Sequence, residues 1–311
     1  GAACASALQA AGLAVEIYDK GRRAGGRMAT RARDQWAFDH GAQYVTAKGP
    51  AFADLLADWE RAGQVAVWNA VHGRHQRFVG VPGMADMVSP LLDGLDRYQN
   101  CEVARLAPDR AGWRLVFLDD REAGPFDAVL VTAPAPQAAT LLHDAAPALT
   151  RTAQTATYAA CCAAMIAAPG PGDAPAALQP ASPSPIAWAC RNETKPDRPQ
   201  PDGAQCWVIH ATPAWSDARL HWDKPDLVAP LQDALETELG ERLGAPLYTA
   251  GHRWRYSLVS EPVGQACLFD AAQGLGAAGD WCLGGRVEAA FDSGRALAAA
   301  LLSSGRYRPS A

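Results

Sequence analysis

The chain opens with the feature that most restricts its fold: a glycine-led helix, then an apolar strand that ends in a carboxylate. Gly1 precedes a run of small residues (2–11) that ends at Gly12, and the apolar strand 14–18 follows with Asp19 at its tip. In a dinucleotide-binding βαβ unit, the glycine lets a pyrophosphate approach the helix N-terminus and the acidic residue binds a ribose hydroxyl. This stretch therefore predicts a nucleotide-binding α/β domain.

Such a unit normally opens with an apolar strand and two further glycines, and neither precedes Gly1. We therefore expect the sequence to lack roughly one strand and one turn at its N-terminus. The alternative is that Gly1 simply begins an alanine-rich surface helix. Segments farther along the chain favour the nucleotide-binding interpretation.

The composition is that of an ordinary folded protein. Hydrophobic residues make up 49% and charged residues 20% of the 311 residues, and the net charge is −5, so we expect neither nucleic acid nor a membrane as a partner. The length allows two domains. The eight cysteines form no C-x-x-C pair. That spacing favours buried free thiols in a reducing, cytoplasmic location over a disulfide scaffold or a metal site.

A basic loop with two adjacent glycines follows Asp19. Gly25 and Gly26 let the backbone approach a ligand closely, and nearby guanidinium groups suit phosphate. The arginines are Arg23, Arg27 and Arg31. The alternative is a basic surface loop. However, an acidic residue at a strand tip with Gly-Gly-Arg beginning six residues later resembles the flavin amine oxidase and phytoene desaturase superfamily.

This resemblance implies that the cofactor is FAD, bound without a covalent link. It places Asp19 at the adenosine ribose and Arg27 beside the pyrophosphate. The family's hairpin valine, whose main chain contacts the adenine, corresponds to Val103. Neighbouring residues expected to contact the cofactor are Gly1, Lys20, Arg23, Gly25, Gly26 and Met28.

The segment Phe38-Asp39-His40-Gly41-Ala42-Gln43-Tyr44 resembles the part of the superfamily that passes the isoalloxazine ring. Its D-x-G-A-Q-Y form is most similar to the renalase-like branch of bacterial FAD-dependent oxidoreductases. The resemblance implies that Gln43 and Tyr44 contact the flavin, and the Gln43 amide has polar atoms that suit flavin or substrate. For His40, a structural role is expected.

A second phosphate-proximal turn lies within 275–295, where a strand is followed by Gly279-Asp280, Gly284-Gly285-Arg286 and an alanine-rich helix. The resemblance implies that Gly279 and Asp280 bind the ribityl–phosphate end of FAD. It also directs the helix N-terminus at the flavin, where the helix dipole favours the anionic reduced ring. The residues at this helix start are Arg286, Val287, Glu288 and Ala289.

The chain as a whole predicts an α/β fold. We expect a Rossmann-like FAD/NAD(P)-binding domain with a buried parallel strand in 126–132, and a substrate domain with a mostly antiparallel β-sheet plus helices. The FAD-binding domain would comprise 1–50, 78–135 and 250–311, and the substrate domain 51–77 and 136–249. Amphipathic helices are predicted at 51–64, 85–95 and 230–243, and solvated loops at 167–185 and 195–203.

Residues 252–256 alternate like a strand. His252, Trp254 and Tyr256 share one face, which is either a pocket wall over the flavin or an ordinary sheet face. Together with two residues of the cofactor segments they form the candidate catalytic set: Gln43, His252, Trp254, Tyr256 and Trp281.

Three classes of function fit these residues. The first, which we favour, is a renalase-like oxidation of a small dihydropyridine, such as an isomeric form of NAD(P)H, by hydride transfer to flavin N5 with oxygen as acceptor. The second is an amine oxidase, whose chemistry typically uses a lysine near N5. The four lysines, Lys20, Lys48, Lys195 and Lys224, all lie in polar or cofactor-loop surroundings in the sequence, which counts against amine oxidation. The third is a non-catalytic flavin-binding protein.

Overall fold

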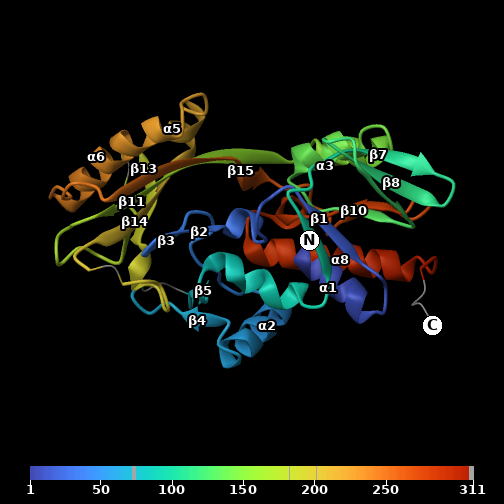
Figure 1. Ribbon diagram of the computed structural model, residues 1–311, viewed down its shortest axis with the longest axis horizontal. Helices are drawn as coiled ribbons and strands as arrows, with labels where there is room; N and C mark the ends of the chain where they lie inside the picture. The colour runs from blue at the N-terminus through green and yellow to red at the C-terminus, as the bar shows by residue number, and fades with distance from the viewer. Residues whose placement is uncertain (72–74, 182, 201, 308–311) are drawn as a thin grey trace. The chain divides into compact units, whose positions relative to one another are not determined.

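The computed structural model describes residues 1–71, 75–181, 183–200 and 202–307. The chain divides into two compact units, both discontinuous in sequence (Figure 1). Unit 1 comprises 1–24, 88–157 and 259–311, and unit 2 comprises 25–87 and 158–258. Thus the segments 25–50, 78–87 and 250–258, which we expected in the FAD-binding domain, cluster with unit 2, and 136–157, which we expected in the substrate domain, clusters with unit 1.

Unit 1 is built from short parallel strand pairs, a three-stranded hairpin sheet and helices. β1 and β6 pair in parallel, as do β10 and β17, whereas β16 joins β17 antiparallel and β7-β8-β9 is antiparallel throughout. Its elements are α1 (Ala2–Ala10), β1 (Glu16–Asp19), β6 (Asp96–Gln99), β7 (Val103–Asp109), β8 (Gly112–Phe117), β9 (Glu122–Phe126), β10 (Val129–Val131), α3 (Ala135–Leu142), α4 (Pro147–Ala153), β16 (Leu268–Asp270), β17 (Leu275–Ala277), α7 (Asp280–Leu283) and α8 (Val287–Ser303). The parallel pairs and the flanking helices confirm the α/β fold class.

The small residues of α1 are explained by packing on two sides. Cys4 and Leu8 pack against Leu297 of α8, whereas Ala5 packs against Leu92 and its neighbours. At the α1–α8 crossing, a side chain at position 294 would lie 3.2 Å from the backbone of α1, so glycine there permits the close approach. A helix held between two apolar surfaces needs small residues all round rather than one apolar stripe.

Unit 2 is centred on a five-stranded sheet of order β12-β13-β14-β11-β15. The pairs β12–β13, β13–β14 and β11–β14 are antiparallel, as expected for the second sheet. Its elements are η1 (Gly26–Met28), β2 (Thr30–Arg33), β3 (Trp36–Asp39), α2 (Pro50–Arg61), β4 (Val65–Val67), β5 (Phe78–Gly80), β11 (Thr157–Ala168), β12 (Ala177–Leu178), β13 (Ile186–Arg191), η3 (Asn192–Thr194), β14 (Gln205–Ala211), α5 (Pro213–Asp217), η4 (Pro225–Leu227), α6 (Val228–Leu239) and β15 (Tyr248–Glu261).

Helices α5 and α6 cover one face of this sheet (Figure 1). Leu231 and Leu235 of α6 pack with Ile166, Trp207 and Ile209 in one buried cluster. Because side chains alternate along a strand, the intervening residues of β11 and β14 face the opposite side. Because one face of the five-stranded sheet is buried under α6, the remaining side chains of β11 and β14 lie on its opposite face. The segment from β3 to Tyr44 contacts this opposite face.

One predicted helix takes a different form. The segment that we expected to be an amphipathic α-helix, 85–95, is the 3-10 helix η2 (Met84–Leu92), which contains Pro90. Proline supplies no N–H and collides with the preceding turn, so regular α-helical hydrogen bonding cannot run through this segment.

Candidate functional site

The nucleotide-binding features of the N-terminal stretch lie together in unit 1. Gly1 caps α1, and a side chain at this position would lie 2.8 Å from the Thr132 hydroxyl. Asp19 ends β1, and its Oδ1 accepts a hydrogen bond from the Gly21 amide at 2.7 Å. Lys20 forms a half-exposed ion pair with Glu102, at 3.6 Å. The Thr132 hydroxyl therefore leaves no room for a side chain at Gly1, and the Asp19 carboxylate is held by its own turn.

The second predicted turn is also part of unit 1. The Gly279 amide donates to Ser293 Oγ of α8 at 3.1 Å, and a Cβ at Gly279 would lie 2.5 Å from Trp281 Nε1. Trp281 is fully buried and its indole N–H donates to the Ala133 carbonyl at 3.1 Å. Glycine is therefore required at this turn, because the Trp281 ring fills the space that any side chain would take.

Helix α8 follows that turn and begins at Val287, with Arg286 as its N-cap residue. Glu288 in the first turn is buried, with Arg286 3.7 Å from its carboxylate. A 17-residue helix presents unpaired amides and a partial positive charge at its start. Unit 1 thus has a glycine at the start of α1 and a glycine turn before α8, and both helices offer N–H groups at their N-termini. Such N–H groups bind phosphate and favour a negatively charged ring edge, so these residues fit FAD.

In unit 2, the Gly-Gly-Arg segment forms a tight turn. Gly25 and Gly26 adopt positive φ angles of 110° and 52°, and a side chain on Gly25 would lie 3.1 Å from Ala85. The Arg27 side chain donates to the Ser257 carbonyl at 3.2 Å, and its guanidinium lies 5.9 Å from the Tyr158 ring centre. Met28 is buried beneath the turn.

The Arg27 backbone also organises the next predicted segment. Its carbonyl accepts the Ala42 amide at 2.8 Å and occupies the space beside Gly41 where a Cβ would lie. The Gly-Gly-Arg turn and the D-x-G-A-Q-Y segment are therefore fixed to each other, and Gly41 is required by that close approach.

A buried carboxylate with two cationic partners forms the centre of the site in unit 2. Asp39 is 0% exposed; Lys195 Nζ lies 3.0 Å and Arg198 NH2 2.8 Å from its Oδ2. Its other oxygen accepts from the Thr30 hydroxyl at 2.6 Å and the Met84 amide at 3.0 Å. Although burial alone would raise it, the two cations and these donors hold the pKa of Asp39 well below its usual range.

One sequence-based expectation is corrected in part here. We expected 195–203 to be a solvated loop; residues 197, 199, 200, 202 and 203 are exposed, but Lys195 and Arg198 are only 1% and 4% exposed. The surroundings of Lys195 are polar, as expected, because its Nζ contacts Asp39 and Gln43. The loop returns to β3 because Asn192 donates to the Ala37 carbonyl at 2.9 Å and accepts the Asp39 amide at 3.2 Å. A carboxylate partner makes the burial of these cations tolerable, and the local sequence carries no sign of it.

Gln43 lies against this carboxylate cluster with both ends of its amide in use. Its oxygen accepts from Lys195 Nζ at 3.2 Å and from the Cys190 thiol at 2.9 Å. Its nitrogen donates to the Asp39 and Gly41 carbonyls, the latter at 3.0 Å. Within unit 2 these contacts fix which way the Gln43 amide points.

Two histidines and one tryptophan contact His40: His210 and Trp254 at its carbonyl, and His252 and Trp254 at its ring. The His40 carbonyl accepts from Trp254 Nε1 at 2.8 Å and lies 3.1 Å from His210 Nε2, which itself lies 3.4 Å from the Gln43 nitrogen. The rings of His40, His252 and Trp254 touch one another, with centroids 4.2–5.4 Å apart. Burial lowers the pKa of His40 and His210 to about 4 and that of His252 to about 3, so all three are neutral at pH 7.

The strand face predicted at 252–256 is present in part as expected. His252 and Trp254 share a face of β15 and meet His40, whereas Tyr256 contacts Tyr158, 5.5 Å between ring centres. Arg253 donates instead to the Leu220 carbonyl. The predicted strand is therefore present, and two of the three residues on its face contact His40; their role beside a flavin stays a prediction.

An aromatic cluster follows Gln43 directly. The Tyr44 ring centre lies 5.7 Å from that of Trp188 and 6.5 Å from that of Trp68, and the Arg77 guanidinium lies 4.7 Å from Tyr44. Lys195 Nζ lies 5.3 Å from the Trp68 ring centre, which joins this cluster to the buried carboxylate. Several residues of the two clusters were not predicted from the sequence as site residues: Asp39, Trp68, Arg77, Trp188, Lys195, Arg198 and His210.

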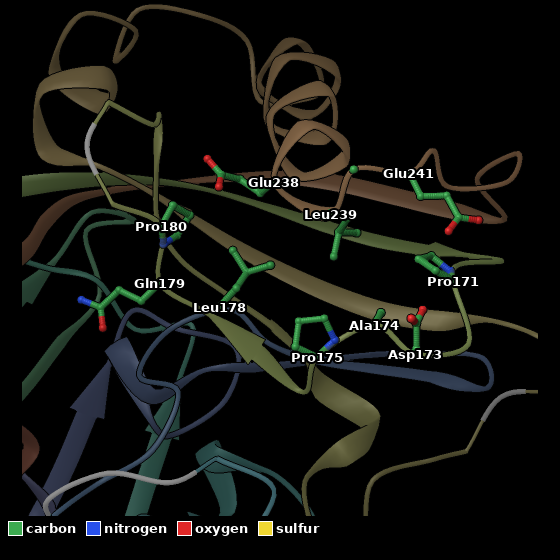
Figure 2. Close-up of a pocket in the computed structure, with 11 residues that line it drawn as sticks. Pro171, Asp173, Ala174, Pro175, Leu178, Gln179, Pro180, Glu238, Leu239 and Glu241 are labelled. Carbon is green, nitrogen blue, oxygen red and sulfur yellow. The ribbon is translucent and has the colours of Figure 1, made fainter.

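A separate cavity of about 320 Å³ lies in unit 2 near the C-terminal end of α6, where carboxylates and apolar side chains surround it (Figure 2). Glu238, Leu239 and Glu241 come from the end of α6 and the residues just after it, and Leu178 comes from β12. No predicted site residue lines it. We attach no function to this cavity.

Across the residues that the structure describes, no cluster of histidine, cysteine and acidic side chains could hold a metal ion. None of the described helices is both long and apolar enough to cross a bilayer.

Comparisons with known proteins agree with this arrangement. A model of the NAD(P)-binding Rossmann-like domain matches residues 1–59, and a model of flavin-containing amine oxidoreductases matches 61–302. Cyclohexylamine oxidase from Brevibacterium oxydans IH-35A is similar in structure, with a TM-score of 0.71 at 13% identity over 98% of this chain and 97% of that one.

Two further solved structures have the same fold. A protein of Exiguobacterium sp. 255-15 described as a candidate protoporphyrinogen oxidase gives a TM-score of 0.74 at 14% identity, with 96% of each chain covered. Wild-type putrescine oxidase bound to putrescine gives 0.65 at 12% identity, over 97% of this chain and 96% of that one. At such identities the likeness extends to the fold alone.

Proposed function

Because the chain belongs to the flavin-containing amine oxidoreductase family, and is thus an FAD-dependent oxidoreductase, we propose that it oxidises a small dihydropyridine, such as an isomeric form of NAD(P)H, with oxygen as the final acceptor. FAD, when bound, supplies the hydride acceptor at its N5 atom. The chain's own residues then have to bind the cofactor, orient a flat substrate and exclude water.

We propose cofactor contacts for the glycine turns of unit 1 and, separately, for the Gly-Gly-Arg turn of unit 2. In unit 1, Asp19 binds the ribose, and the starts of α1 and α8 bind phosphate and the ring edge. In unit 2, the segment from Asp39 to Tyr44 is held rigid by its buried ion pairs, so it presents one fixed surface. Such rigidity is what orientation of a hydride donor needs.

One observation counts against a cationic substrate. Lys195 and Arg198 share the single carboxylate of Asp39 at 3.0 and 2.8 Å, all three side chains being buried. The cluster therefore carries an excess positive charge in a medium of low dielectric constant, which opposes entry of an ammonium group. A dihydropyridine ring enters uncharged and needs no base, and the neighbouring histidines, uncharged at pH 7, add no further charge.

Amine oxidation is the second candidate, and the burial of Lys195 favours it. We expected from the sequence that no lysine would suit this reaction, but Lys195 is 1% exposed and its Nζ contacts the Gln43 amide oxygen. An amine must lose its proton before it can give up a hydride, and the positive cluster would assist that loss once the amine is bound.

Anaerobic mixing separates the two candidates. We expect the visible flavin absorbance of FAD-loaded protein to bleach with the 2- or 6-dihydro isomers of NAD and to remain with a panel of primary amines. Admission of oxygen should then restore the absorbance and release one hydrogen peroxide per bleached flavin. Bleaching by amines alone would overturn the proposal in favour of the second candidate.

A further inference from the structure

Two ring N–H groups hold one main-chain carbonyl in the segment that we assign to the flavin. We propose that His210 and Trp254 are positioning residues: by binding the His40 carbonyl, they direct the next main-chain N–H, that of Gly41, to the edge of the flavin ring as a hydrogen-bond donor. The acceptor is N5 or the C4 carbonyl oxygen of that ring. The assignment rests on the function proposed above, because that function places this segment beside FAD.

The contacts at the His40 carbonyl are direct. Trp254 Nε1 lies 2.8 Å and His210 Nε2 lies 3.1 Å from this oxygen. Burial lowers the pKa of His210 to about 4, so at pH 7 its ring is neutral and has a single N–H. Because a carbonyl only accepts, that N–H is on Nε2. Both rings come from strands of one sheet, β14 and β15, so the two donors have a rigid support.

A carbonyl held in this way fixes the whole peptide group to which it belongs. The peptide bond between His40 and Gly41 is trans. In a trans peptide group the C=O and the N–H point in opposite directions. The Gly41 N–H is therefore directed away from the rings of His210 and Trp254.

Two main-chain amides of this segment have no acceptor in the part of the chain that the structure describes. Gly41 and Gln43 are both buried, yet neither main-chain N–H donates to a described residue. The amide between them differs, because Ala42 donates to the Arg27 carbonyl at 2.8 Å. Buried N–H groups are nearly always paired, so these two indicate a ligand with an acceptor atom. The Gly41 N–H is the one whose direction the carbonyl contacts fix.

The flavin ring supplies acceptors of the required kind. Its N5 atom and its C4 carbonyl oxygen are neighbours on one edge of the ring, and both carry lone pairs. A main-chain donor that is already oriented before the cofactor binds loses little freedom on binding. His210 and Trp254 thus act on the cofactor through the peptide group of Gly41 and need not touch it.

Flavin NMR of the holoprotein tests this assignment. Protein that carries FAD labelled with ¹⁵N at N5 and ¹³C at C4 is compared as wild type, Trp254→Phe and Trp254→Phe/His210→Phe. Each substitution keeps an aromatic ring and removes an N–H. We expect one of the two resonances to differ from its position in free FAD in the wild type. It should move back towards that position in the single variant and farther in the double variant.

The midpoint potential of the flavin gives a second readout. The double variant should change it by about 30 mV, which for two electrons is a tenfold change in the relative binding of the two oxidation states. The potential should fall where the C4 resonance responds, because a donor at that oxygen stabilises the charge of the reduced ring. It should rise where N5 responds, because N5 of the reduced ring carries its own hydrogen and the donor favours the oxidised ring.

The matched control is Trp113→Phe, which removes an indole N–H that donates to the Gln273 carbonyl at 2.8 Å in unit 1. It should leave both resonances and the potential unchanged. His210→Gln should stay closer to the wild type than His210→Phe does, because the glutamine amide can still donate. Unchanged resonances in Trp254→Phe and in the double variant, or an equal change in Trp113→Phe, would overturn the proposal.

Anaerobic bleaching of the same proteins by the dihydro isomers keeps the two proposals distinguishable, since neither NMR nor the potential needs a substrate. Resonances that respond to the variants, in a protein that the isomers do not bleach, would refute the proposed reaction and leave the positioning role in place. Bleaching by the isomers, with resonances that ignore the variants, would refute the positioning role alone.

Discussion

The buried group of Asp39, Lys195 and Arg198 gives the sharpest prediction, because its members are not equivalent. Asp39→Asn removes the carboxylate that the two cations share, at 3.0 and 2.8 Å, and leaves both cations buried. Stranding a buried charge costs about 3–5 kcal/mol of stability. Lys195→Met instead leaves Asp39 paired with Arg198, Thr30 and the Met84 amide, so we expect a loss of about 1–2 kcal/mol.

The double variant tests the reasoning more directly than either single change. With Asp39→Asn already present, Lys195→Met removes one of the stranded cations, so the second substitution should restore about 1–3 kcal/mol rather than cost more. The assay is urea unfolding of FAD-saturated protein at pH 7, monitored by tryptophan fluorescence and compared through the midpoint and slope.

The control is an exposed ion pair outside this cluster. Arg61→Met removes one partner of the exposed Arg61–Asp58 pair and should cost less than 1 kcal/mol, as surface ion pairs do. The reasoning is refuted if Asp39→Asn costs no more than Lys195→Met, or if the double variant is the sum of the two losses.

The remaining predictions concern pH and two packing contacts. Burial lowers the pKa of His40 from 6.5 to about 4, so below pH 6.5 the unfolded chain binds more protons than the folded one. The free energy of unfolding should therefore fall as the pH drops from 6.5 towards 4, by about 2 kcal/mol at pH 5 from this residue alone. An unfolding midpoint that stays constant from pH 7 to 5 would contradict this. Gly41→Ala places a methyl group on the Arg27 carbonyl and should weaken FAD retention in equilibrium dialysis, whereas Gly172→Ala, which meets nothing within 4 Å, should not. Leu231→Ala in the α6 core, where the side chain is 0% exposed, should cost about 2–5 kcal/mol in urea unfolding without changing the flavin spectrum.

The turns that we propose to contact the cofactor could be predicted from the sequence because their signals are local. Asp19 lies at a strand tip two residues from the amide that it binds, and the glycine turns require positive φ or close approach within a few residues. Such constraints act over short distances along the chain, so spacing alone reveals them.

The polar cluster in unit 2 was decided by the tertiary structure. Lys195 and Arg198 stand in a proline-rich, charged stretch that reads as a surface loop, and the carboxylate that makes their burial tolerable lies 156 and 159 residues away. Likewise, Arg77, which precedes β5, and Trp188 of β13 are far apart in the sequence and lie close together only in the folded chain, beside Tyr44. The sequence by itself determined the α/β fold and the FAD family, since these rest on local turns and apolar periodicity. Which charged side chains are buried, and so the chemistry beside the cofactor segment, depends on a partner distant in sequence, and only folding brings that partner into contact.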